Sequence, residues 1–214
     1  DVAKAIVEHA VELKADLIVM CTHGRGGLRE VLFGSIAQQV TAQGSSPVLL
    51  VRPPASGPPP AFKCDRVLAP DDATAEHEPG LDLIAALAAR CASRIRLVMV
   101  VETAGTLTGR EAASGTLLPT ATRLMLEMAQ AGAEKHLAEH VRLLQAQGVQ
   151  ASAEVRRGDP AQALAQAARQ WGADVVVIRT HGKAGTKAFW SASLAPRLAA
   201  AVDLPLLLIP VGGG

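Results

Sequence analysis

A long internal repeat constrains the fold of this chain more than any other feature of the sequence. The stretch from Asp1 to Val51 recurs without a gap from Asp159 to Ile209. The offset is constant, because the two Thr-His-Gly triplets place His181 against His23, and 181 minus 23 gives 158. Solenoid repeats have periods of about 20 to 50 residues, so a repeat of this length indicates duplication of a domain-sized unit.

The two copies are not equally complete. Residues 62–157 precede the second copy, and the first copy has no equivalent of them. We therefore expect a partial unit over residues 1–52, a Pro-rich linker over residues 53–62 and a complete unit over residues 63–211. Either the chain begins inside its first domain, or the half-unit is an accessory in its own right.

Helical patterns and apolar runs alternate along both copies. Apolar residues recur at helical spacing over residues 3–13, and uninterrupted apolar runs follow at residues 17–20 and 175–178. Runs without polar alternation fit strands that are buried on both faces, as in a parallel sheet flanked by helices. The complete unit reads β-α-β-α-β-α-β-α-β, which predicts a doubly wound α/β sheet whose weakest strand lies near residues 152–155.

Composition and charge exclude several classes of partner. The net charge is +1 with scattered Lys and Arg, and the 2% of aromatic residues include no Tyr, so nucleic-acid binding is not expected. No apolar run reaches the roughly 18 residues of a membrane span, and no leader opens the chain. We therefore expect a cytoplasmic protein that binds neither nucleic acid nor a membrane.

A glycine-rich turn follows the apolar run of the first copy. In an open α/β sheet, ligands lie beyond the carboxyl ends of strands, where a helix start offers free amides to phosphate. Here the run continues into Cys21 and Gly24, and a new helix is expected around Gly34 and Ser35. Glycine lets backbone amides approach an anion, and the Ser35 hydroxyl adds a donor. The turn suits a di- or triphosphate.

At this turn the chain resembles the universal stress protein family, whose nucleotide-binding members carry the pattern G-x2-G-x9-G-[ST] between a strand and a helix. The first copy gives Cys21-x2-Gly24-x9-Gly34-Ser35 and then a strand from Pro47 to Val51, so only the first glycine departs. The resemblance covers essentially the whole chain. It implies a five-stranded sheet in the order 3-2-1-4-5, with the fifth strand at an edge.

The second copy departs further from the family pattern. It gives Arg179-x2-Gly182-x9-Ala192-Ser193, so two of the three motif glycines are replaced. Side chains at Arg179 and Ala192 would crowd the path of the phosphates. The guanidinium of Arg179 could equally bind phosphate itself, so the site is either altered or lost.

The second copy retains the half of a nucleotide pocket that would hold the base. Its first strand ends in Pro70-Asp71-Asp72, which matches the family's P-x-D ending, so the resemblance implies that Asp72 contacts the adenosine. The resemblance also implies that Val100 takes the place of an apolar residue that lines the adenine in the family. Asp72 would suit a helix N-cap or a turn equally well, and both roles can coexist. The better phosphate loop and the strands for the base thus belong to different copies.

The resemblance implies a stress-response protein that binds an adenine nucleotide, ATP or another, with Mg²⁺ as a companion ion. Binding is expected to be weak or confined to one site, and regulatory. The alternative is a ligand-free scaffold for dimerisation or interaction, with a degenerate nucleotide site. An enzyme ranks last, because the sequence reveals no general base, metal-ligand cluster or arginine finger, although the family includes slow ATP hydrolysis.

The histidines form no recognisable catalytic or metal-binding set. His23 and His181 stand in identical Thr-His-Gly contexts without a carboxylate partner that the sequence reveals. His136 and His140 have the i, i+4 spacing of a metal-binding pair, but no third ligand is apparent. We therefore expect this pair to be solvated surface and expect no metal site.

The resemblance also implies how the partial unit is accommodated. In tandem or dimeric members the edge strand pairs with the equivalent strand of the partner unit, so residues 48–51 should lie antiparallel to residues 206–209. The run at residues 17–20 would keep a bare edge, which invites another strand. We expect either a second copy of the chain there, in a homo-oligomer, or a missing N-terminal segment.

Overall fold

The computed structural model describes residues 1–21, 35–52, 57, 61–72, 78–107, 109, 113, 117–181 and 188–211. The helices are α1 (Val2–Glu12), α2 (Ser35–Gln43), α3 (Glu78–Cys91), α5 (Pro119–Ala146), α6 (Pro160–Trp171) and α7 (Ala188–Ala201). The strands are β1 (Ile18–Cys21), β2 (Val48–Val51), β3 (Arg66–Asp71), β4 (Arg94–Val101), β5 (Gln150–Arg157), β6 (Val175–His181) and β7 (Leu206–Val211). In this described part of the chain, every helix is too short or too polar to cross a bilayer.

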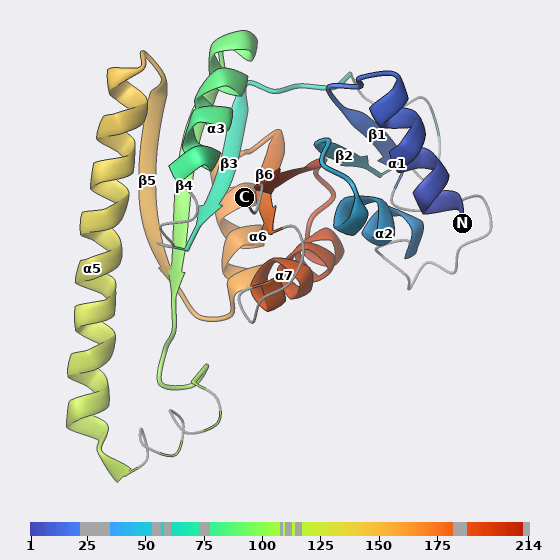
Figure 1. The fold of residues 1–214 in the computed structure, drawn as a ribbon. Coiled ribbons are helices and arrows are strands. Elements are labelled where there is room, and N and C mark those ends of the chain that lie inside the picture. The colour runs from blue at the N-terminus through green and yellow to red at the C-terminus, as the bar shows by residue number, and fades with distance from the viewer. Residues whose placement is uncertain are drawn as a thin grey trace.

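One sheet contains all seven strands, in the order β1-β2-β7-β6-β3-β4-β5 (Figure 1). From β3 onward all neighbouring strands pair in parallel. Numbered along the chain from β3, these five strands follow the order 3-2-1-4-5, as the family resemblance implies. The α/β doubly wound sheet expected from the apolar runs is therefore present.

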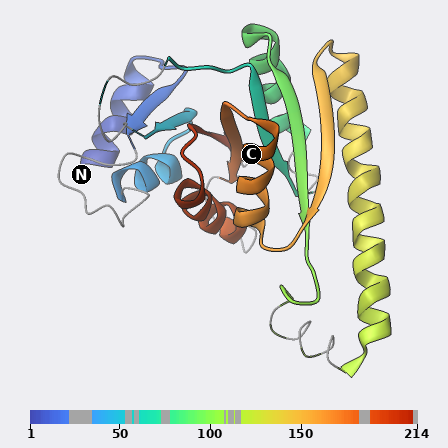
Figure 2. The same ribbon diagram turned by 180° about the vertical axis from the view of Figure 1, so that it is seen from behind.

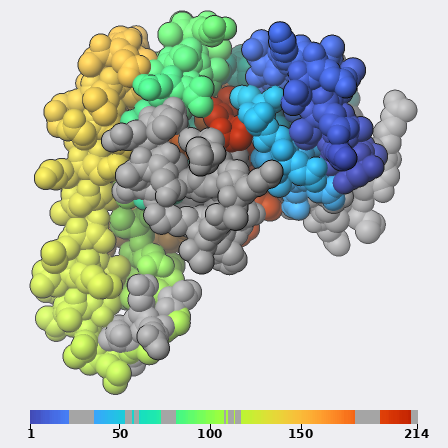
Figure 3. All heavy atoms as spheres, viewed as in Figure 1, coloured from blue at the N-terminus to red at the C-terminus, as the bar shows by residue number. Residues whose placement is uncertain are grey.

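The elements within residues 1–52 repeat those at the end of the chain, since α1, β1, α2 and β2 follow the same order as α6, β6, α7 and β7. β1 and β2 pair in parallel. β2 then pairs antiparallel with β7, placing Val48 opposite Leu208, Leu49 opposite Leu207 and Leu50 opposite Leu206. The predicted antiparallel contact is confirmed. Figures 2 and 3 place α1 and α2, in blue, on the opposite flank of the molecule from α5.

This antiparallel contact sets the strand directions in the two parts of the sheet. β3 to β7 all run one way, whereas β1 and β2 run the other way. The carboxyl end of β1 at Cys21 and the carboxyl end of β6 at His181 therefore lie at opposite rims of the sheet.

Each face of the sheet has its own apolar core. We call the face covered by α1, α2, α6 and α7 the first face, and the face covered by α3 and α5 the second face. Successive strand residues point to opposite faces, so Leu68 and Val176 join the first core, while Val67 and Val175 join the second. The uninterrupted apolar runs of the sequence are the result of this burial on both sides.

Local signals in the sequence fix the bounds of α6. Asp159 Oδ1 accepts a hydrogen bond from the Gln162 amide at 3.1 Å, and Pro160 follows at the start of the helix. Gly172 ends the helix in the left-handed conformation, with φ 66°. Arg197 donates to Asp159 Oδ2 at 2.5 Å, and this hydrogen bond lowers the pKa of the Asp159 carboxyl.

β5 is longer than the sequence predicts. It covers Gln150–Arg157 and pairs with β4 along its full length, rather than being a weak strand near residues 152–155. β5 is an edge strand with half-exposed side chains, including an ion pair between Glu154 and Arg156 at 3.1 Å. An apolar run marks only strands buried on both faces, so this strand gave a weaker signal.

β1 forms the other edge of the sheet. Its residues alternate between half-buried and exposed, and Val19 is 60% exposed. Among the strands that the structure describes, β1 pairs with β2 alone. The outer side of β1 therefore has the backbone geometry that accepts another strand.

Candidate functional site

The predicted anion-binding turn of the first copy lies between β1 and α2. Cys21 is the last residue of β1 and is exposed, and Ser35 is the first residue of α2. The turn is thus preceded by a strand and followed by a helix, as expected. Gly24 and Gly34 lie outside the described residues, and so does the side chain of Ser35.

The corresponding turn of the complete unit lies between β6 and α7. Gly182 lies outside the described residues. Ser193 belongs to α7. The side chains of Ser193 and His181 lie outside the described part of the structure, and so does the whole of His23. Arg179 is therefore the residue of this motif whose side-chain contacts are known.

The residues expected to hold the base meet at the carboxyl ends of β3 and β4. Pro70 is buried in β3, and Asp72 directly follows that strand and is half-buried. Val100 is half-buried in β4 and packs against the core of the first face. Because Asp71 pairs with Met99, the next positions, Asp72 and Val100, reach the same level of two neighbouring strands.

The residues expected to bind phosphate and those expected to hold the base lie at opposite rims of the sheet. Ser35 begins α2 beyond the carboxyl end of β1, whereas Asp72 and Val100 lie at the carboxyl ends of strands that run the other way. By the repeat, β1 corresponds to β6, and β6 pairs with β3 on its far side. Among the described residues, no strand lies beside β1 as β3 lies beside β6.

The side chain of Arg179 lies on the second face of the sheet, where it is buried. Its side chain is 4% exposed, and Nη2 lies 3.2 Å from the carbonyl oxygen of Pro70 and 3.4 Å from Oδ1 of Asp71. The parallel pairing of β6 with β3 brings Arg179 beside Asp71. Val175 pairs with Val67, and Arg179 and Asp71 each lie four positions further along their strands. The sequence left open whether this guanidinium blocks or binds phosphate, and in the structure it contacts β3.

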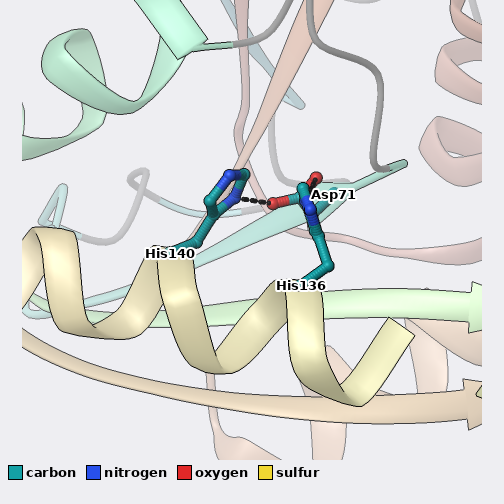
Figure 4. A group of neighbouring side chains, drawn as sticks. All are labelled: Asp71, His136 and His140. Carbon is teal, nitrogen blue, oxygen red and sulfur yellow. Dashed lines mark hydrogen bonds and ion pairs between the residues drawn. The ribbon is translucent and has the colours of Figure 1, made fainter. Parts of the chain in front are cut away.

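Asp71 is the centre of a buried polar cluster that the sequence does not predict (Figure 4). Its side chain is 0% exposed at the end of β3. His140 Nδ1 lies 2.6 Å from Asp71 Oδ2, and His136 Nε2 lies 3.3 Å from Asp71 Oδ1. We call Asp71, His136 and His140 the Asp-His cluster.

The expectation that the two histidines are solvated surface is wrong. His140 is 7% exposed and the side chain of His136 is 26% exposed. His140 lies three residues after Leu137 and four before Leu144, so it shares the helical face that α5 buries in the second core. That spacing was the available signal. The carboxylate partner was missed because Asp71 is 65 positions before His136.

Both oxygens of the buried Asp71 carboxylate have partners. A buried carboxylate is costly unless it is paired and hydrogen-bonded, and Asp71 faces His140 at one oxygen and Arg179 at the other. The rings of His136 and His140 are 4.0 Å apart between centroids and are tilted by 59°. Two imidazoles and a carboxylate in this arrangement can share protons among themselves or act together as metal ligands.

The model of the universal stress protein family matches residues 1–52 and 63–210 of this chain. Among curated proteins, a universal stress protein of Methanocaldococcus jannaschii is 50% identical over 52 residues, which are 24% of this chain and 31% of that protein. The stress response protein NhaX of Bacillus subtilis is 36% identical over 52 residues, again 24% and 31%. The aligned stretches thus span less than a third of these relatives.

Solved structures of the same family share the fold. A universal stress protein from Archaeoglobus fulgidus has a TM-score of 0.65 at 15% identity, over 99% of this chain and 66% of that chain. A universal stress protein family member from Burkholderia pseudomallei has a TM-score of 0.53 at 22% identity, over 71% of this chain and 99% of that chain. At these identities the likeness concerns the fold alone.

Proposed function

The chain belongs to the universal stress protein family, and on that basis we propose that it is a stress-response protein that binds an adenine nucleotide as a regulatory ligand. The observation that carries this proposal is the junction of β1 with α2. Cys21 ends the strand and Ser35 begins the helix, at the spacing of the family pattern. A helix start beyond the carboxyl end of a strand directs free amides and the positive end of the helix dipole toward phosphate.

The phosphates are proposed to bind at Gly24, Gly34 and Ser35, and the base alongside β1. The strand that covers β1 would occupy the position that β3 occupies beside β6, so it would carry the counterpart of Asp72. The same strand would thus close the sheet edge and complete the pocket. We propose that a second copy of the chain or an N-terminal segment supplies it, which makes nucleotide binding weak without it.

The complete unit is proposed to bind nucleotide poorly. Asp72 and Val100 reach the same level of two neighbouring strands, which supports an adenine half of the pocket at this place. Ala192, however, replaces the glycine that lets the phosphates approach the helix start. Arg179 contacts Pro70 and Asp71 on the second face, while Val100 packs on the first. These observations favour one functional site over two.

A ligand-free interaction scaffold is the second candidate function. The observation that favours it is the contact of Arg179 with Pro70 and Asp71, which directs the long side chain of the second motif to protein groups. The antiparallel contact of β2 with β7 is an assembly feature that needs no ligand. In that case the family motif of the first copy would be a remnant.

We propose a nucleotide-binding protein that is not an enzyme, acting in the cytoplasm. ATP is the first ligand to test, and Mg²⁺ would accompany it mainly through the phosphate oxygens, which is how this ion usually enters nucleotide sites. Slow ATP hydrolysis is a separate property. Release of phosphate from ATP over hours measures it directly, beside the binding experiment.

Calorimetric titration of ATP into the chain tests the proposal. Wild type should bind, whereas Gly34→Asp should not, because the new carboxylate would face the phosphates. Gly132→Asp is the matched control: Gly132 is exposed on α5, and an added Cβ would meet nothing within 4 Å. If neither wild type nor Gly34→Asp gives heat of binding, the proposal that the chain binds a nucleotide is wrong. A gain of binding in the double variant Arg179→Gly with Ala192→Gly would assign a degenerate site to the complete unit.

A further inference from the structure

Three donor atoms converge beneath α5, on the second face of the sheet. Asp71, His136 and His140 each offer one ligand atom, and these atoms lie within 4.8 Å of one another. The Asp-His cluster is on the second face, because Val67 and Leu137 beside it belong to the second core. Val100 of the proposed pocket packs on the first face. The cluster therefore has its own place in the fold and a role that nucleotide binding does not explain.

We propose that the Asp-His cluster binds one divalent transition-metal ion of the Zn²⁺ class. Two imidazole nitrogens and one carboxylate oxygen form a donor set typical of zinc, whereas Mg²⁺ and Ca²⁺ prefer oxygen ligands alone. Three protein ligands leave a fourth position of the tetrahedron for water. His136, with 26% of its side chain exposed, is the ligand nearest to solvent and marks the route by which the ion and this water enter.

One of the donor distances in the cluster equals that of a metal site, and small side-chain movements would bring in the others, since all three donor atoms lie within 4.8 Å of one another. In a tetrahedral zinc site with bonds of about 2.0 to 2.1 Å, neighbouring donors lie about 3.3 Å apart. The His136 Nε2 to Asp71 Oδ1 distance is 3.3 Å. The His140 Nδ1 to Asp71 Oδ2 distance is 2.6 Å, that of a hydrogen bond, so the ion would replace the proton between them and separate the two atoms.

Two rigid elements hold the ligands in place. His136 and His140 are four residues apart on α5, which puts both rings on one face of the helix, 4.0 Å apart between centroids. Buried Leu137 and Leu144 anchor this face to the sheet. Asp71 ends β3, a central strand that pairs on both sides. The site would thus tie α5 to the middle of the sheet.

Arg179 is expected to limit the affinity of the site. Its Nη2 lies 3.4 Å from Asp71 Oδ1. The guanidinium of Arg179 therefore already pairs with the carboxylate that the metal ion would need as a ligand. Because the site is buried, the repulsion between the guanidinium and a divalent ion held by the same carboxylate is only weakly screened. Replacing Arg179 by Met keeps a long side chain but removes the charge, and should therefore strengthen metal binding.

The test is titration of the metal-stripped chain with Co²⁺, followed by its visible absorption, and displacement of Co²⁺ by Zn²⁺. Wild type should bind one equivalent. His136→Ala and His140→Ala should each weaken binding at least about tenfold, because changing even the outer partners of metal ligands typically costs about 10- to 100-fold. Arg179→Met should strengthen binding. His9→Ala is the matched control, since His9 is an exposed histidine of α1 paired only with Glu12.

Each outcome decides the proposal. If His140→Ala does not fold, judged by circular dichroism, His136→Ala still decides, because His136 is partly exposed. Wild type without bound Co²⁺ or Zn²⁺ at micromolar concentration overturns the site. Binding that persists unchanged in both histidine variants overturns it too, as does binding that is lost in Cys64→Ser or Cys91→Ser instead. Because ATP is absent throughout, a chain that binds no metal ion would not contradict the nucleotide proposal. Equally, a chain that binds no ATP would not contradict the metal site.

Discussion

His140 Nδ1 lies 2.6 Å from Asp71 Oδ2, although the two residues are 69 positions apart in the chain. The contact joins the middle of α5 to the end of β3, and both residues are buried. Because Arg179 faces the other oxygen of the same carboxylate, a change at Asp71 affects both partners at once. The packing of the second face depends on this carboxylate as well as on its apolar core.

Asp71→Asn is expected to lower the free energy of unfolding by about 3 to 5 kcal/mol, because it removes one partner of a buried charge pair. Asp203→Asn is the matched control, since Asp203 also pairs with an arginine, Arg52, but its side chain is 89% exposed. That variant should cost at most about 1 kcal/mol. Urea unfolding followed by circular dichroism compares the two, and equal losses would contradict the argument from burial.

The Asp159–Arg197 pair should make part of the stability pH-dependent. The hydrogen bond from Arg197 holds the pKa of the Asp159 carboxyl below its usual range. A carboxyl whose folded pKa is depressed stabilises the fold above its unfolded pKa, about 3.9, and loses this contribution as pH falls through the folded pKa. Wild type should therefore lose up to about 1 kcal/mol relative to Asp159→Asn below about pH 4, since Asn still caps the helix. Thermal unfolding as a function of pH tests this, and parallel curves would refute it.

Leu50→Ala should destabilise the attachment of β1 and β2 to the rest of the sheet. Leu50 is 1% exposed and lies opposite Leu206 in the antiparallel contact, so its truncation should cost about 2 to 5 kcal/mol. Leu143→Ala, at a position 45% exposed on α5, should change stability by about 0.5 kcal/mol or less. Hydrogen exchange should show protection lost first in β1 and β2. Uniform loss across all strands would argue against a separable attachment.

Val19→Lys should weaken association through β1. Val19 is 60% exposed on this edge strand, and lysine on an edge opposes the addition of another strand. Val2→Lys, at a position 59% exposed on α1, adds the same charge away from the edge and should leave association unchanged. Light scattering against concentration measures both. A wild-type chain that stays monomeric at all concentrations, with no added segment, would contradict the prediction.

Much of the fold could be predicted because its signals are local or repeated. Uninterrupted apolar runs identified the strands buried on both faces, and Asp159 with Pro160 fixed the start of α6. The repeat, together with the family resemblance, gave the pairing of β2 with β7. β5 was underestimated because an edge strand has one polar face, and polar residues interrupt the pattern that marked the other strands.

The Asp-His cluster could not be predicted in the same way. The family motif directs attention to Asp72, whereas the buried acid is Asp71, one residue earlier and on the other face of the sheet. Its partners come from α5 and β6, far along the chain, and only the packing of α5 on the second face brings them together. The burial of His140 was foreseeable from its spacing to Leu137 and Leu144, but its partner was not.

The register of β2 against β7 gives the chain an internal twofold axis. Leu49 and Leu207 are equivalent positions of the repeat and face each other, while Val48 opposite Leu208 mirrors Leu50 opposite Leu206. Such self-complementary contacts are those of an isologous homodimer, here built into one polypeptide. An interface that separate subunits would form only at sufficient concentration is therefore permanent in this protein, whatever its abundance in the cell.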